Sequence, residues 1–156
     1  MDYKELLVEF AAQIGISDDV RLDDDGVWRI GTDGIVFSFR EVPECNALLV
    51  YSSIGELPVQ GAEAFKTAIL QANYLEQGVP SGAFSLDRDK RVWVHRYFDL
   101  NSLDVTGLMD GFEGFVTLVL EWRRLKDACR GDEGQGGMPP DNFDTPDQIP
   151  SDFVRV

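Results

Sequence analysis

The sequence is poor in cysteine, in histidine and in long apolar runs. Its two cysteines, Cys45 and Cys129, form no C-x-x-C pair, so neither a disulfide framework nor a cysteine metal site is expected and the thiols indicate a reducing, cytoplasmic compartment. The longest apolar runs are about half a dozen residues, far below the ~18 that span a bilayer, which predicts no membrane insertion. Charges at Asp2, Lys4 and Glu5 predict that no secretory signal is present.

Basic residues are also scarce. The chain has 14 Lys and Arg against 28 Asp and Glu, giving a formal net charge of −14. Such a charge excludes a nucleic-acid binder, because phosphates need a positive surface, and disfavours docking on anionic lipid. It favours basic or poorly folded partners. The 156 residues and the apolar share of 44% suit one folded core.

No pattern for catalysis, metal binding or a cofactor stands out. His95 is the only histidine and lies in an aromatic strand, where a packed or surface side chain is the commoner role than a general base. The acidic cluster at 18–25 fails as a calcium loop. With Gly26 at loop position 6, Arg21 would occupy position 1 and Thr32 position 12. We expect no catalytic residue, no metal and no cofactor, with a small enzyme of unknown chemistry as the weaker alternative.

Hydrophobic periodicity predicts three helices and five strands in the order α-β-β-β-α-β-β-α, an α+β sandwich with helices packed on an antiparallel sheet. The first helix carries the stripe Leu6, Leu7, Phe10, Ala11, Ile14 and ends at Gly15. The last begins near Ser102, with Ser102 as N-cap, and ends near Cys129. The remaining elements are strands at 27–30, 35–40 and 47–54, a helix at 61–76, and strands at 83–86 and 92–98.

The last 26 residues differ from the rest. Residues 131–156 hold four of the seven prolines and a net charge of −5, without an amphipathic period. We therefore expect one domain over residues 1–130 and a flexible acidic tail over 131–156, with a short docking motif at 149–156.

The predicted strands carry apolar residues on both faces. A sheet with one face in water should alternate apolar and polar residues, yet Val36, Leu49 and Tyr51 lie out of phase with the presumed core. Helices covering both faces would explain this pattern. A partner covering part of one face, through dimerisation or peptide binding, explains it equally.

Several segments together resemble a known family. They are Leu6-Leu7-x-x-Phe10, then Leu48-x-Val50-x-Ser52-x-Ile54-Gly55-x-Leu57-Pro58, Ile69-Leu70-Gln71-Ala72-Asn73-Tyr74-Leu75, Gly82 to Asp87, and Phe115 to Leu125. In this order and spacing they resemble the class I type III secretion chaperones, the CesT/Tir-chaperone family, over residues 1–129. Ser52, the glycines of the last helix and the long tail depart from the family pattern. Acidity and size are also similar to the HpaB-type general export-control chaperones.

The resemblance implies a small, acidic, cytoplasmic homodimer without enzymatic activity. Such chaperones hold the N-terminal segment of a type III effector in extended form and present it to the secretion ATPase. An acidic regulator that sequesters a partner is the alternative function.

On that basis the sequence predicts two surfaces. The dimer interface would comprise Phe65, Ile69 and Ala72 of the second helix, extended by Trp93 and Tyr97. The effector-binding residues would be Phe10, Val27, Val36, Leu49 and Tyr51, because an extended peptide can pair with a strand edge and bury one side chain in two.

Overall fold

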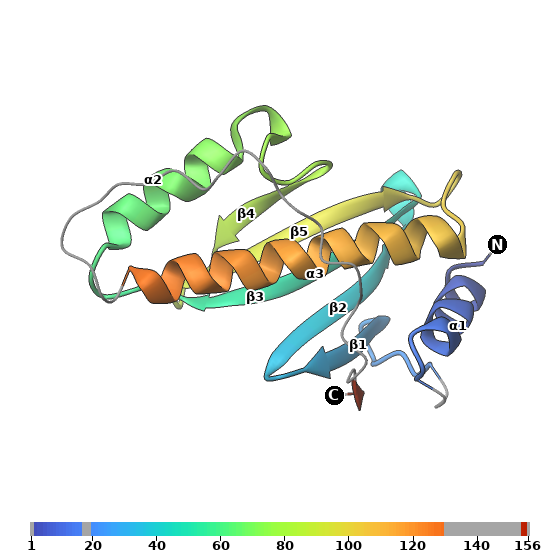
Figure 1. Cartoon of the computed structure of the whole chain (residues 1–156). Helices are drawn as coiled ribbons and strands as arrows, with labels where there is room; N and C mark the ends of the chain where they lie inside the picture. The colour runs from blue at the N-terminus through green and yellow to red at the C-terminus, as the bar shows by residue number, and fades with distance from the viewer. Residues whose placement is uncertain (1, 17–19, 130–153, 156) are drawn as a thin grey trace.

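The computed structural model describes residues 2–16, 20–129 and 154–155, and these form three α-helices packed on an antiparallel sheet (Figure 1). The helices and short 3-10 turns are α1 (Tyr3–Gln13), η1 (Pro43–Cys45), α2 (Ala62–Ala72), η2 (Tyr74–Glu76) and α3 (Val105–Ala128). The strands are β1 (Val27–Thr32), β2 (Ile35–Val42), β3 (Ala47–Glu56), β4 (Gly82–Leu86), β5 (Arg91–Asp99) and β6 (Val154–Arg155).

The sheet has the strand order β4-β5-β3-β2-β1-β6, and every neighbouring pair is antiparallel. The β1–β2 hairpin closes over two residues, Asp33 and Gly34, whose φ angles are 49° and 74°. Positive φ at both central positions suits the right-handed twist of the flanking strands, and Asp-Gly tolerates it. This turn fixes the register in which Trp28 lies opposite Phe39.

The helix α3 lies along one face of the sheet and supplies the centre of the core (Figure 1). The Phe112 ring lies 5.2 Å from that of Phe37, 5.3 Å from that of Phe39 and 5.3 Å from that of Phe10 in α1. These edge-on and tilted ring pairs add to the apolar burial. The Tyr3 hydroxyl of α1 donates to the carbonyl of Phe39 at 2.9 Å, which fixes α1 to β2.

The helix α2 packs on the same face through Phe65, whose ring lies 5.8 Å from that of Trp122 in α3. The helix is shorter than predicted and ends at Ala72. The following turn η2 contains Leu75 with φ 50° and ψ 35°, which interrupts the helical backbone. The side chains after Ala72 therefore do not continue the apolar stripe of α2.

The predicted fold class and element order are confirmed for residues 2–16 and 20–129. The N-cap of α3 is Asp104 rather than Ser102, because the Asp104 carboxylate accepts a hydrogen bond from the Gly107 N–H at 2.8 Å. Of the predicted tail over 131–156, residues 131–153 and 156 lie outside the described residues, while Val154–Arg155 form the strand β6.

Candidate functional site

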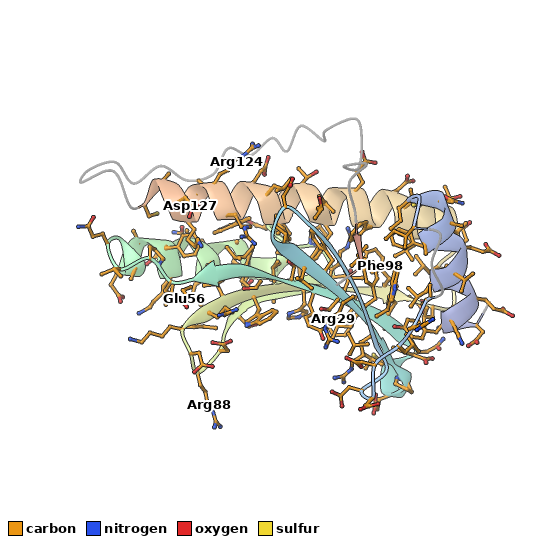
Figure 2. The ribbon with its side chains drawn as sticks, turned by 90° about the horizontal axis from the view of Figure 1, so that it is seen from below. Arg29, Glu56, Arg88, Phe98, Arg124 and Asp127 are labelled. Atoms are coloured by element: carbon orange, nitrogen blue, oxygen red, sulfur yellow. The ribbon has the colours of Figure 1, made fainter. Side chains whose placement is uncertain are left out.

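The face of the sheet opposite the helices is the candidate site. Figure 2 shows α2 and α3 on one side of the sheet and Arg29 on the other. Ring contacts place Phe10 of α1 on the α3 side as well. The explanation that helices cover both faces of the sheet is therefore wrong for the described residues.

Strand register arranges the outer face in rows that run across the sheet. Leu49 of β3 lies between Arg40 of β2 and Tyr97 of β5. In the next row Tyr51 lies between Ser38 and His95. In the third row Trp93 lies opposite Ser53 on one side and Ser85 of β4 on the other. Because alternate residues of a strand share a face, these side chains form one continuous surface.

This surface contains an open groove of about 300 Å³. Among the residues that the structure describes, its lining comes from strands β2 to β5 and consists of Arg40, Leu49, Tyr51, Ser85, Trp93, His95 and Tyr97. The Tyr51 and Trp93 rings lie 6.2 Å apart, and the His95 and Tyr97 rings lie 5.5 Å apart with nearly perpendicular planes. A groove with aromatic walls and scattered polar groups is suited to side chains of a bound peptide.

Asp87, in the turn between β4 and β5, positions the Trp93 indole. One carboxylate oxygen accepts from the N–H groups of Asp89 at 2.9 Å and Arg91 at 2.8 Å. The other accepts from Trp93 Nε1 at 2.8 Å. The Trp93 bond, followed by the backbone bonds, lowers the pKa of Asp87, so the carboxylate is charged at neutral pH and holds the indole at the groove.

Asp23, before β1, accepts a similar set of hydrogen bonds. Its carboxylate accepts from the N–H groups of Asp25 and Val27, each at 2.9 Å, and pairs with the Arg29 guanidinium. The bond to Asp23 raises the pKa of Arg29. The acidic cluster that precedes β1 thus supplies an Asx-type turn and an ion pair.

The predicted effector-binding residues separate into two groups. Leu49 and Tyr51 line the groove, and Val36 is exposed on the same face. Phe10 and Val27 are buried. Phe10 packs among the rings of Trp28, Phe39 and Phe112, so its side chain belongs to the core and does not close a surface groove.

The predicted dimer-interface residues lie on opposite faces of the sheet. Phe65 and Ile69 point from α2 into the core, and Ala72 is half-buried beside them. Trp93 and Tyr97 line the outer groove instead. One planar interface on a single face of the sheet cannot contain both groups.

Exposed apolar side chains of α2 and η2 escaped the sequence reasoning. Leu70, Tyr74 and Leu75 are 70%, 63% and 75% exposed. Leu70 adjoins the buried Ile69 on the helix, whereas Tyr74 and Leu75 lie in η2, where Leu75 has a positive φ. The apolar period that predicted a helix over 61–76 contains no sign that the helix ends at Ala72.

A second pocket of about 210 Å³ lies between the segment before β4 and α3. Its lining includes Val79, Phe115, Leu118 and Arg96. Burial lowers the pKa of Arg96. One Arg96 amino group donates to the carbonyl of Gly111 at 3.3 Å, and the guanidinium lies 4.8 Å from the centre of the Phe98 ring.

His95 lies in the outer groove, where burial lowers its pKa and favours the neutral imidazole at pH 7. Within the described residues, no three His, Cys, Asp or Glu side chains are close enough together to hold a metal ion. Among the described residues, none of the helices is long and apolar enough to cross a membrane.

The model of the Tir chaperone protein (CesT) family matches residues 5–123. No curated protein matches the sequence.

Three solved structures share the fold. The ExsC–ExsE complex contains a chain of TM-score 0.69 and 20% identity, with 81% of this chain and 97% of that chain covered. The Yersinia pestis type III secretion chaperone SycH, in complex with a stable fragment of YscM2, matches with a TM-score of 0.63 and 20% identity, and the match covers 78% of this chain and 99% of that chain. The HopA1–SchA chaperone–effector complex contains a chain that matches with a TM-score of 0.64 and 17% identity, and the match covers 78% of this chain and 93% of that chain.

Proposed function

The chain belongs to the Tir chaperone protein (CesT) family, and from this membership we propose that it binds the N-terminal segments of type III effectors in extended form. Membership in a chaperone family agrees with the predicted non-enzymatic role. The bound segment stays soluble and competent for secretion, and the chaperone delivers it to the secretion ATPase in the cytoplasm. The single observation that supports ligand binding most directly is the uncovered aromatic groove on the outer face of the sheet.

The groove fits an extended peptide for a geometric reason. Side chains of an extended chain alternate, so every second residue points to the same side at intervals of roughly 7 Å. Leu49 and Tyr51 are themselves spaced in this way along β3, and Trp93 and Tyr97 extend the apolar contact across β5. Apolar side chains of the effector segment would occupy the spaces between these residues.

Charge would select among such segments. The formal net charge of −14 attracts basic segments over a distance. Within the groove, Arg40 is the cationic lining residue, so an acidic or polar side chain of the ligand is favoured beside it. The acidic surface also keeps the open aromatic face from self-association.

The test uses the variants Leu49→Ala and Tyr51→Ala. The probe is the N-terminal segment of an effector that copurifies from the source bacterium and is identified by mass spectrometry. Each variant should weaken binding of the fluorescently labelled segment by roughly 1–3 kcal/mol, as expected for residues at the centre of an interface. Val8→Ala, at an exposed position of α1, is the matched control and should leave binding unchanged.

Thermal unfolding of the same variants separates binding from folding. Leu49 and Tyr51 are only half-buried on a face without helices, so the melting temperature should change little. A variant that binds as well as the wild type, or that loses affinity only because it unfolds, would count against the groove as the effector site.

The proposed homodimer forms through the outward side of α2 and η2. Leu70, Tyr74 and Leu75 give an exposed apolar patch of the kind that marks protein interfaces. Leu70→Asp should yield a monomer near 17.5 kDa by light scattering, and Val8→Asp should not. Ile69→Asp is unsuitable for this test, because Ile69 packs inside the subunit and the variant would unfold it.

A further inference from the structure

Arg96 is a charged residue at a core position of β5. Val92, Val94 and Phe98 of the same strand are buried in the core, and alternate residues of a strand share a face, so Arg96 lies on the helix side of the sheet. Its Nε atom is buried and has no hydrogen-bond partner. A buried cation is costly unless an anion or a set of acceptors compensates it.

The described residues compensate this guanidinium only in part. One amino group donates to the Gly111 carbonyl at 3.3 Å, and the guanidinium lies 4.8 Å from the centre of the Phe98 ring. None of the ion pairs among the described residues includes Arg96. The nearby Glu76 carboxylate accepts from the N–H of Ser81 at 2.9 Å instead. Although burial lowers the pKa of Arg96, a guanidinium stays protonated in proteins, so a full charge faces this region.

The space beside Arg96 is the pocket of about 210 Å³ between α3 and residues 77–80. Val79, Phe115 and Leu118 give it apolar walls. Gly114 also lines it, and a Cβ atom there would meet nothing within 4 Å, so the missing side chain helps to keep the space open. For comparison, an apolar cavity of about 150 Å³ can bind benzene. The pocket therefore has room for a ligand of roughly six to eight carbon atoms.

We propose that this pocket binds a small monocarboxylate with an apolar body of roughly six to eight carbon atoms. The carboxylate pairs with Arg96, because a guanidinium forms its strongest hydrogen bonds with carboxylates. The apolar body lies against Val79, Phe115 and Leu118. The net charge of −14 repels anions at long range, so direct contact with Arg96 is what selects the acid.

This site is separate from the groove assigned to effector segments. The pocket is lined by α3 and lies on the helix side of the sheet, whereas the groove lies on the outer face. A bound acid would connect β5, α3 and the segment between η2 and β4. Because it binds the folded protein, it should stabilise that state in proportion to its occupancy.

The first experiment compares two probes of the same shape on the full chain by NMR titration. Phenylacetate, with ten non-hydrogen atoms, should bind with a dissociation constant of about 1 mM or lower. Phenylacetamide, which lacks the charge, should bind at least tenfold more weakly. The Nε–H signal of Arg96 should shift with phenylacetate. Equal affinities for the two probes, or no binding of phenylacetate, would overturn the proposal.

Variants then locate the site. Arg96→Gln should weaken phenylacetate binding at least tenfold and leave phenylacetamide binding unchanged. Gly114→Leu should prevent binding of both probes by filling the pocket. Arg40→Gln, which removes the cation of the outer groove, is the matched control and should change neither affinity. Unchanged binding to Arg96→Gln, or a loss with Arg40→Gln, would place the acid elsewhere and overturn the assignment.

Thermal unfolding gives a readout that uses no titration signal. Phenylacetate at ten times its dissociation constant should raise the melting temperature of the wild type by about 3–6 °C, and that of Arg96→Gln by at most about a third as much. Equal gains in the two proteins would contradict the proposal. Affinity that falls as the protein concentration rises would show that a carboxylate of a second copy fills the pocket, contrary to the proposal. No effector is used, so these results are independent of the proposed function.

Discussion

The glycines of α3 allow a quantitative test of how the core is packed. Each glycine costs a helix interior roughly 1 kcal/mol relative to alanine, yet two of them have opposite surroundings. A Cβ atom at Gly111 would overlap Cε1 of Phe98 and lie 3.0 Å from its Cζ. A Cβ atom at Gly114 would have no neighbour within 4 Å. The substitutions Gly111→Ala and Gly114→Ala therefore share the same gain in helix propensity and differ in packing.

The expected magnitudes follow from these contacts. Gly114→Ala should raise the free energy of unfolding by about 1 kcal/mol, since it gains propensity without a clash. Gly111→Ala gains the same free energy from helix propensity but must displace the Phe98 ring. That ring is buried, and the Arg96 guanidinium lies over it, 4.8 Å from its centre. Overpacking of this kind costs about 1–3 kcal/mol. The two variants should thus differ by roughly 1–3 kcal/mol, with Gly111→Ala the less stable.

Urea unfolding followed by tryptophan fluorescence measures both variants, and equal slopes with urea would show that the unfolded state is unchanged. In thermal unfolding the difference corresponds to about 2–12 °C in melting temperature for a chain of this length. If the two variants were equally stable, the close approach of α3 to β5 at Gly111 would be refuted. A stabilised Gly111→Ala with a destabilised Gly114→Ala would refute the orientation of the helix.

Three further predictions concern the site and its edges. Asn73→Ala should lower the free energy of unfolding by about 1–3 kcal/mol, because both backbone groups of Phe84 lose their partner. Urea unfolding measures this change, with exposed Thr67→Ala as the control. An unchanged midpoint would show that the Asn73 side chain does not stabilise the β4 edge. Asp87→Ala should free the indole of Trp93, giving a red-shifted fluorescence and weaker effector binding; an unchanged spectrum would refute the positioning role. Burial lowers the pKa of His95, so the unfolded state binds a proton more readily below about pH 6.5. The wild type should therefore lose stability relative to His95→Gln as the pH falls from about 7 to about 5, and a constant difference would show that the folded protein does not desolvate this imidazole.

Much of the fold follows from local sequence patterns. The stripe through Leu6, Leu7 and Phe10 has the helical period, and its residues are buried in α1. The Asp33-Gly34 pair fixes a two-residue hairpin and hence the register of β1 with β2. Such features depend on neighbours within a few residues, so the sequence states them directly.

Local sequence patterns predicted the residues of the groove only in part. Strand alternation placed Leu49 and Tyr51 out of phase with the core, and both line the outer groove. The same alternation put Trp93 and Tyr97 on one face of β5, but it did not show that this face adjoins Leu49 and Tyr51. That adjacency follows from the pairing of β3 with β5, which is decided by residues about 45 positions apart.

By itself, then, the sequence determined the element types, their order and which residues of each strand share a face. The tertiary structure alone decided which face the helices cover, that α2 buries Phe65 while exposing Leu70, and that Asn73 closes the β4 edge. The physical reason is that periodicity identifies the two faces of an element without indicating which of them the rest of the core will cover. The choice between them depends on the contacts of distant segments, such as Trp122 of α3 with Phe65 and Phe84, which form only when the whole core assembles.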